Sequence, residues 1–342
     1  MTPPSTEQLT PLFKQYWEIK RQYPDVILMF RLGDFYEMFA GDAETASRAL
    51  EITLTSRDYV GGERIPMCGV PHHAVDRYVA RLIASGHRVA LCEQMEDPRF
   101  AKGIVKRKVT RVVTPGTVLE DSMLEAKANN YLAAVAATSE DPEHAAFGLA
   151  VCDVSTGEFA VTEIAGTDAA RRLSDELDRL APRELVLPEK LDEAWQGWLS
   201  EGRPWVVTPL KAEHFPRKTP RQALLDHFGV HSLRGFGCEE MELAIQAAYS
   251  VLAYLGHRHI EAAKHIRSLT TYSVSQFMCL DPTARRNLEL TQTMWDGGRS
   301  RTLLSVLDAT CTAMGGRTLR KWLEQPLLDL VTINERLDAV QE

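Results

Sequence analysis

The sequence predicts a multidomain α/β protein whose last part is all-α. Its 342 residues are 44% hydrophobic, which is enough for two or three globular domains that each bury a core. Up to about residue 238, short apolar runs bounded by turn residues alternate with helical periodicity, the order typical of an α/β fold. From about Glu239 onward the periodicity is mainly helical, so an all-α part is expected there.

The first segment, residues 1–117, is expected to form a mixed-sheet α/β domain. A buried strand is indicated between Pro24 and Gly33, and apolar residues at helical spacing from Val75 predict a helix that ends at Gly86. The expected elements are, in order, a strand at 25–31, a helix from 34 to about 50, the helix that begins at 75, and strands at 88–94 and 104–114.

The second segment, residues 118–267, is expected to be a further α/β domain after a polar linker, and residues 268–342 are expected to begin an all-α core. We expect the chain to end inside this third segment, because residues 334–342 are helix-like and meet no cap or glycine. The elements expected in the second segment are strands at 131–137, 147–154 and 158–164, a helix at 169–180, a strand at 184–187, a helix at 191–199 and a strand at 205–207.

The net charge of −8 argues against binding of nucleic acid by bulk attraction, so such a partner requires a local basic patch. Strict alternation along a strand would place Arg107 and Arg111 on one face and Lys106 and Lys108 on the other. A solvated edge strand protected by lysines is the alternative interpretation of this run. The patch lies within residues 97–111 and contains Arg99, Lys102, Lys106, Arg107, Lys108 and Arg111.

A cytoplasmic protein that does not enter a membrane is expected. The sequence has no run of about 18 apolar residues, and its first residues lack the basic-then-apolar order of a signal peptide. The six cysteines include no CxxC pair, which favours reduced, buried thiols over disulfides or a zinc ribbon. Cys68, His72, His73 and Cys92 do not have a familiar zinc-ligand spacing, so no metal site is expected.

The segment Arg31-Leu-Gly-Asp-Phe-Tyr-Glu37 follows the first buried strand and allows two interpretations. Taken alone, it predicts an ordinary helix start, with Asp34 as the N-cap and Glu37 as its partner in an acidic capping box. Phe35 and Phe39 lie four residues apart, so both would then pack on one apolar stripe. This structural interpretation is the simpler one when the segment is considered without the rest of the chain.

Six sequence blocks favour the second, functional interpretation. In this order they resemble the MutS family of DNA mismatch-recognition proteins, and the middle segment matches the family through the order of its elements. The blocks are Phe30–Phe39, Leu54–Arg57, Ile65–Ala74, Val89–Gln94, Arg107–Thr117, and Arg285–Leu290 followed by Leu304–Asp308 and Met314–Leu323.

The resemblance implies that Phe35 enters the minor groove and stacks on a mispaired base, while Glu37 hydrogen-bonds that base. Insertion of such a wedge costs a few kcal/mol, because it separates stacked bases. The wedge therefore favours the base that is most easily unstacked. Glu37 would either reject well-paired DNA or accept a proton from the mispair, and the sequence leaves both open. Leu32 would pack beside the wedge. The family's DNA-contacting cations correspond to Arg57, Lys106 and Arg107, of which Arg107 is expected to clamp the backbone.

The resemblance also implies a ribonuclease H-like fold for the connector at 118–267. A metal-dependent nuclease with an accessory nucleic-acid domain is therefore the alternative function, with Asp153 as its candidate carboxylate. A two-metal site needs several acids around ions roughly 4 Å apart, and Glu158, Asp175 and Glu184 do not form a convincing set. A scaffold that relays signals between domains is the favoured interpretation of this segment.

The expected partner is double-stranded DNA that contains mispairs or small loops. For the full-length family protein the resemblance implies ATP and Mg²⁺ as cofactors, homodimerisation and a MutL-type partner. The present sequence contains no Gly-Lys dipeptide, which a phosphate-binding P-loop requires. No cofactor, catalytic residue or enzyme activity is therefore expected for this chain.

Overall fold

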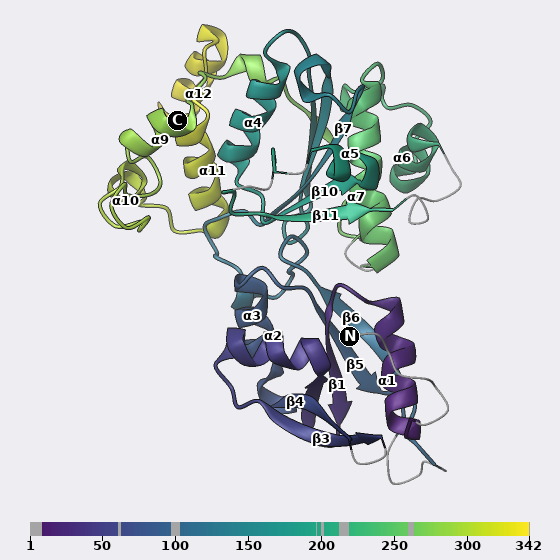
Figure 1. Ribbon diagram of the computed structural model, residues 1–342. Helices are drawn as coiled ribbons and strands as arrows, with labels where there is room; N and C mark the ends of the chain where they lie inside the picture. Colours follow the sequence, from purple (N-terminus) through teal and green to yellow (C-terminus); the bar gives the residue numbers. More distant parts are fainter. Residues whose placement is uncertain are drawn as a thin grey trace. The chain divides into compact units, whose positions relative to one another are not determined.

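The computed structural model describes residues 9–60, 63–96, 103–195, 197–199, 202–211, 219–258 and 263–341. The chain forms two compact units, Met1–Pro115 and Gly116–Glu342, and each contains its own β-sheet (Figure 1). The domain boundaries predicted after residues 117 and 267 stay predictions.

The first unit is built on a mixed sheet, as the sequence predicts. Its strand order is β3-β4-β2-β1-β5-β6; β1 and β5 run parallel, and the other neighbouring pairs run antiparallel. The predicted strands at 25–31, 88–94 and 104–114 are confirmed, as is the helix from Val75, whereas α1, β3 and β4 were not anticipated. The elements are α1 (Pro11–Gln22), β1 (Ile27–Leu32), β2 (Phe35–Phe39), α2 (Ala40–Leu50), β3 (Thr55–Val60), β4 (Glu63–Pro71), α3 (Val75–Ala84), β5 (Val89–Gln94) and β6 (Arg107–Val113).

The helix predicted from Asp34 is wrong in its first part, because Phe35–Phe39 is a strand and α2 begins only at Ala40. β1 and β2 form a hairpin in which Leu32 pairs with Phe35 across a two-residue turn. Gly33 takes a positive φ of 59° in that turn, a conformation that glycine adopts without strain. An acidic capping box is therefore excluded, since neither member of the predicted pair lies at a helix start.

The two faces of this sheet are covered by different helices. α1 lies on one face, where the rings of Phe13 and Tyr16 meet Phe39 edge-on at centroid distances of 5.1 and 5.0 Å. Tyr16 also packs against Phe30 at 5.5 Å. α2 contacts β2 and β4, and α3 contacts β4 and β5, on the opposite side. The face that carries Phe30 and Phe39 is called the α1 face below.

The second unit contains a sheet of strand order β11-β10-β7-β8-β9-β12. β7, β8 and β9 are antiparallel neighbours, whereas β10 runs parallel to both β7 and β11. The predicted strands and the helix at 169–180 are confirmed; the helix expected at 191–199 is shorter, and α6 was missed. The elements are β7 (Tyr131–Ala137), β8 (Phe147–Asp153), β9 (Glu158–Ile164), α4 (Ala169–Leu180), β10 (Glu184–Pro188), α5 (Glu189–Ala194), β11 (Val206–Leu210), α6 (Pro220–Phe228), α7 (Glu242–Arg258) and β12 (Thr270–Thr271).

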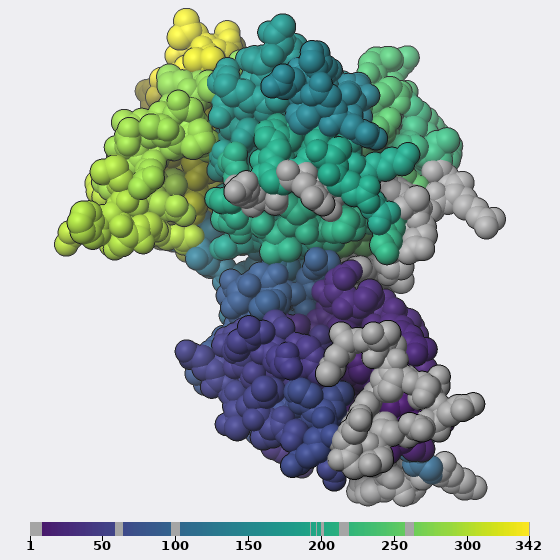
Figure 2. Space-filling view, in the orientation of Figure 1, coloured from purple at the N-terminus to yellow at the C-terminus, as the bar shows by residue number. Residues whose placement is uncertain are grey.

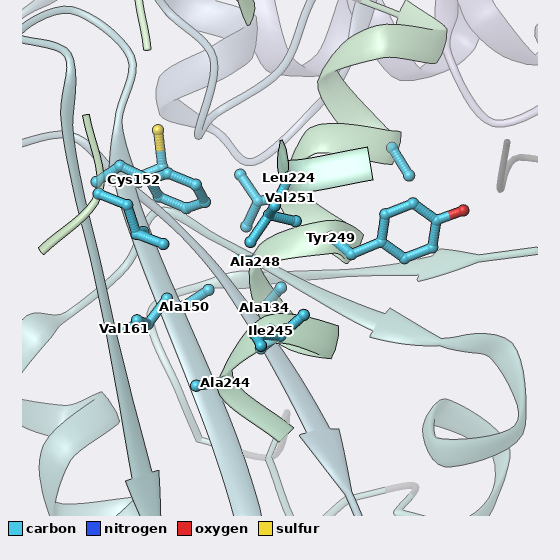
Figure 3. Packing of buried hydrophobic residues seen from close by; sticks show 14 of the residues in the cluster. Ala134, Ala150, Cys152, Val161, Leu224, Ala244, Ile245, Ala248, Tyr249 and Val251 are labelled. Atoms are coloured by element: carbon cyan, nitrogen blue, oxygen red, sulfur yellow. The ribbon is translucent and has the colours of Figure 1, made fainter. Parts of the chain in front are cut away.

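Helix α7 packs directly on this sheet through small residues. Figure 3 shows Ala244, Ile245 and Ala248 of α7 facing Ala134 and Ala150 of the central strands. A Cβ atom added at Gly148 would lie 2.0 Å from the carbonyl oxygen of Leu243, so the helix backbone occupies the place of a side chain. The carboxylate of Glu163 accepts hydrogen bonds from the Leu243 and Ala244 amides, at 2.7 and 3.1 Å, which caps the helix start.

Helices are the main regular elements among the described residues after β12, and they pack against the rest of the second unit, as the yellow-green surface in Figure 2 shows. The all-α core expected from residue 268 stays a prediction. Lys127 in the linker before β7 reaches Asp308 with its ammonium group 3.0 Å from the carboxylate. In the described part of the chain, no helix is long and apolar enough to cross a bilayer. The helices are α9 (Pro282–Asn287), α10 (Leu303–Leu307), α11 (Ala313–Glu324) and α12 (Leu330–Gln341).

Candidate nucleic-acid interface

Phe35 lies at the tip of the β1–β2 hairpin and is the exposed aromatic residue of β2. Its side chain is 47% exposed, whereas Phe39 at the other end of the same strand is only 1% exposed. The prediction that both rings pack on one apolar stripe is therefore wrong, because only Phe39 enters the core. Leu32 is half-buried and lies directly opposite Phe35 in the hairpin register. The hairpin thus presents an aromatic ring beside an aliphatic side chain.

Five of the six predicted site residues lie on the α1 face of the sheet. Leu32 pairs with Phe35 and Phe30 pairs with Glu37, and paired residues of neighbouring strands share a face. Glu37 pairs with Gly69 of β4, and Ile65, four residues earlier on β4, lies on the same face. Ile65 pairs with Arg57 of β3, so Arg57 lies on the α1 face as well. On the other side of β1, Phe30 pairs with Cys92 of β5, so Cys92 also lies on the α1 face. Gln94 lies two residues after Cys92 and therefore has the same face, and it pairs with Arg107 of β6.

Lys106, the sixth predicted residue, immediately precedes β6 and is exposed. Its backbone N–H donates to the carboxylate of Glu96 at 2.8 Å, and its carbonyl accepts from the Met95 amide. These contacts fix the backbone at this corner and leave the ammonium group in solvent. Arg99 and Lys102 of the predicted basic run lie outside the described residues.

Glu37 is held by an ion pair with Arg57, whose Nη1 lies 2.5 Å from its Oε2. The arginine reaches across β4 from the neighbouring strand β3. Gly69 lies between them on β4, and a Cβ atom there would be 3.5 Å from the Cγ atom of Glu37 and 3.9 Å from the ring of Phe35. The absence of a side chain at Gly69 leaves room for the carboxylate and the aromatic ring to lie next to each other.

Arg107 is engaged within its own domain. Its Nε donates to the carbonyl of Arg31 at 2.6 Å, and its Nη1 donates to Gln15 and to the carbonyl of Val105. The guanidinium also stacks over Phe30, 5.0 Å from the ring centroid. Burial lowers the pKa of this arginine from its ordinary value. Arg107 therefore ties α1, β1 and β6 together, a role that the sequence did not predict because α1 and Gln15 were not anticipated.

A β-bulge corrects the predicted faces of β6. Arg107 pairs with Gln94 and Val109 with Cys92, but Arg111 pairs with Leu91, so one residue of β6 is left without a counterpart. Arg111 consequently lies on the face opposite Arg107, contrary to the prediction that the two share a face. Strict alternation fails here because a bulge reverses the order of the faces along the strand.

Cys68 and Cys92, two of the residues considered as zinc ligands, lie on opposite faces of the first sheet. Cys68 pairs with Met38 and lies on the face opposite Cys92, which pairs with Phe30 on the α1 face. Burial raises the pKa of both thiols to about 12. No cluster of three potential metal ligands is present among the described residues. Cys279 and Cys311 are exposed, which corrects the prediction that all six thiols are buried.

Asp153, the candidate nuclease carboxylate, is fully buried and acts as a hydrogen-bond acceptor. Its Oδ1 accepts from the backbone N–H and the hydroxyl of Ser155, at 3.0 and 2.6 Å. Its Oδ2 accepts from the side chain of Asn129 and the amide of Asn130. The same Asn129 amide donates to Glu158 at 3.1 Å. These contacts fasten the linker to β8 and turn both carboxylates toward protein donors.

Comparisons with known proteins identify the family. Three family models match: MutS domain I over residues 10–122, MutS domain II over 130–267 and MutS domain III over 283–342. The chain is 50% identical, over 97% of its length, to a protein from Symbiobacterium thermophilum that is named DNA mismatch repair protein MutS. It is 49% identical, over 98% of its length, to a protein of the same name from Syntrophobacter fumaroxidans. One from Methanosarcina acetivorans is 43% identical over 98%. The chain spans 37–38% of the length of these relatives. It therefore belongs to the MutS family of DNA mismatch repair proteins.

Proposed function

We propose that this chain recognises mispaired or unpaired bases in double-stranded DNA, with Phe35 as a wedge that enters the minor groove. The observation that carries the proposal is the exposure of Phe35 at a hairpin tip, beside the carboxylate of Glu37. The ring of Phe35 is 47% exposed, whereas Tyr36 and Phe39 of the same strand are buried. The Phe35 ring is therefore available to stack on a base.

A wedge at a hairpin tip suits the discrimination of mispairs. Inserting a ring between base pairs unstacks one step and kinks the duplex, at the expense of a few kcal/mol. A mispaired base is already poorly stacked, so it requires less of this energy than a paired base. Rigid support for the wedge comes from Phe30 and Phe39, which anchor the two hairpin strands in the core. Leu32 is proposed to flank the inserted ring.

Glu37 and Arg57 are proposed to act together beside the wedge. A lone carboxylate close to phosphates and base edges repels DNA, and the neighbouring guanidinium offsets that charge. When DNA is bound, Arg57 is proposed to turn toward a phosphate, which leaves Glu37 to meet the base at the wedge. Lys106 and Arg107 are proposed as further phosphate contacts. Of these two, the exposed Lys106 is better placed to move.

Residues after the first unit are proposed to connect recognition with other parts of a longer protein. The strand order of the second unit, with three antiparallel strands followed by two parallel ones, supports the ribonuclease H-like connector that the resemblance implies. For the full-length protein we propose homodimerisation, ATP and Mg²⁺ as cofactors and a MutL-type partner. The nuclease alternative is not favoured, since Asp153 is bound by protein donors.

Competition binding tests the proposed function directly. The purified chain is expected to bind a duplex with one G·T mispair or one unpaired T more tightly than the matched duplex of the same sequence. Equal affinity for the three duplexes, in a protein shown to be folded by circular dichroism, would contradict the proposal.

A further inference from the structure

A cavity of about 630 Å³ lies in the second unit, between the C-terminal end of α4 and the helices α9 and α11. Its size falls within the range of about 300–1,000 Å³ that small-molecule sites occupy. Eight of its lining residues are arginine or lysine, and two, Asp178 and Glu324, are acids. Such a concentration of cations is unexpected in a chain whose net charge is −8.

Four of the eight cations are neutralised by carboxylates of this chain, and one of these pairs is buried. The Arg179 guanidinium meets the buried Glu176 at 2.6 Å, and this pairing outweighs burial and raises the pKa of the arginine. These four residues are explained by their ion pairs, which are Arg179–Glu176, Arg299–Glu125, Arg320–Glu324 and Lys321–Glu158.

The other four cations are Arg183, Arg285, Arg286 and Arg317. Within the part of the chain that the structure describes, no carboxylate lies within the 4.0 Å of an ion pair with any of them. Arg285 donates from Nη2 to the carbonyl of Asp175 at 3.0 Å, and Arg317 donates from Nε to that of Ala128 at 3.4 Å. A carbonyl group satisfies a hydrogen bond but carries no charge to form an ion pair with the guanidinium.

Arg285 shows the consequence most clearly. Its Nε atom is buried and has no acceptor among the described residues. Burial lowers the pKa of this guanidinium and the neighbouring charge of Arg179 lowers it further, which together outweigh the opposite effect of the carboxylates of Glu324, Glu176 and Asp175. A partly buried cation next to a second cation is unfavourable unless an anion offsets the charge. An anion in the cavity would accept a hydrogen bond from this buried Nε atom and offset the excess of positive charge in the lining.

We propose that this cavity binds a compact polyphosphate anion, with Arg183, Arg285, Arg286 and Arg317 as its ligands. The planar guanidinium keeps its charge and can offer two parallel hydrogen bonds to phosphate oxygens, so arginine suits this class of ligand. Four guanidinium groups around one cavity match a chain of several phosphates better than a single small anion. The chemistry is shared by inorganic polyphosphate and by the triphosphate of a nucleotide.

Calorimetric titration of the 342-residue chain with sodium tripolyphosphate at constant ionic strength tests this site. Saturable binding with one anion per chain is expected. Arg183→Ala combined with Arg286→Ala should weaken it about tenfold or more. Both side chains are exposed, so the fold should survive, which a thermal melt would verify. Arg234→Ala combined with Arg267→Ala removes the same charge from exposed positions that do not line the cavity, and should leave the affinity unchanged.

Two outcomes would overturn the proposal: no saturable binding of tripolyphosphate, or an equal loss of affinity in both double variants. If the cavity variant fails to fold, the single change Arg286→Gln replaces it with the same expected direction. A parallel titration with a nucleoside triphosphate distinguishes the sources of the ligand. Tighter binding than tripolyphosphate supports a nucleotide, and equal or weaker binding supports free polyphosphate.

Discussion

The guanidinium of Arg57 and the carboxylate of Glu37 form an ion pair across strand β4, with 2.5 Å between Nη1 and Oε2. The arginine side chain is 40% exposed and that of the glutamate 17%. A pair this exposed contributes about 1 kcal/mol or less to the free energy of unfolding. Its main consequence is therefore local, since it sets the net charge beside the exposed ring of Phe35.

This pair predicts how Glu37→Gln changes DNA binding. Without the carboxylate, the charge of Arg57 is uncompensated and attracts phosphates, so affinity for a matched duplex should rise and the preference for a mispair should fall. Competition binding at fixed salt measures both. In the variant that also carries Arg57→Ala, the gain in affinity for matched DNA should disappear. If that gain stays undiminished, it comes from removal of repulsion by Glu37 itself, and the proposed coupling is wrong.

Phe35→Ala is expected to separate binding from stability. The ring is 47% exposed, so its removal should leave the melting temperature nearly unchanged. Loss of a base–aromatic stack is worth about 1–3 kcal/mol, which would lower the preference for G·T or unpaired-T duplexes roughly 5- to 150-fold.

Phe39→Ala provides a matched control on the same strand. This ring is 1% exposed and packs against Phe13 and Tyr16, so its truncation should lower the free energy of unfolding by about 3–5 kcal/mol. The remaining folded protein should keep its mispair preference. A large stability loss for Phe35→Ala with unchanged preference would instead make Phe35 a core residue.

Much of the fold follows from periodicity in the sequence. The strand Tyr131–Ala137 and the helix Ala169–Leu180 have the predicted bounds, because each combines a clear apolar pattern with turn residues at its ends. α1 was missed although its sequence marks it: Pro11 lies at its start, and Phe13, Tyr16 and Trp17 have helical spacing. Its buried contacts with Phe39 are long-range and could not be predicted.

The candidate site was predicted by residue type and not by geometry. Glu37 and Phe35 were assigned to a helix, although Gly33-Asp34 between apolar runs is itself a hairpin signal. The pairing of Glu37 with Arg57 could not be predicted, because it depends on the strand order β3-β4-β2. Likewise, the bulge that moves Arg111 to the other face depends on the register with β5.

Arg107 and Lys106 should differ in what their removal changes. Arg107→Ala deletes hydrogen bonds to Gln15 and to the carbonyl of Arg31 and is expected to lower the free energy of unfolding by about 1–3 kcal/mol. Lys106→Ala should leave stability unchanged but reduce the salt dependence of binding by about one unit, equally for matched and mispaired DNA. Because Arg107 is also proposed as a phosphate contact, Arg107→Ala should reduce the salt dependence as well, and an unchanged salt dependence in a folded Arg107→Ala variant would contradict that proposal.

Asp308 should give the second unit a defined response to acid. Hydrogen bonds from Thr310 and Lys127 lower its pKa from 3.8 to about 2. Because the folded-state pKa is below the ordinary one, its stabilising contribution is present above about pH 4 and is lost as the pH falls through about 2. The free energies of unfolding of the native chain and of Asp308→Asn, measured by urea unfolding, should therefore converge as the pH falls toward 2. Lys127→Met should weaken the same pH dependence, and a pH-independent difference between native chain and Asp308→Asn would contradict the assignment.

Gly148→Ala is expected to destabilise the second unit by displacing α7 from the sheet. The added Cβ would lie 2.0 Å from the carbonyl oxygen of Leu243 and 2.6 Å from the amide nitrogen of Ala244, and both are backbone atoms that cannot rotate away. Overpacking of a tight core costs about 1–3 kcal/mol, and a shift of the helix would also weaken its cap by Glu163. Gly235→Ala is the matched control, because an added Cβ there meets no atom within 4 Å and Gly235 does not have a positive φ. Chemical denaturation of the two variants should show a loss only for Gly148→Ala; equal stability of both would mean that α7 does not rest on the backbone of β8.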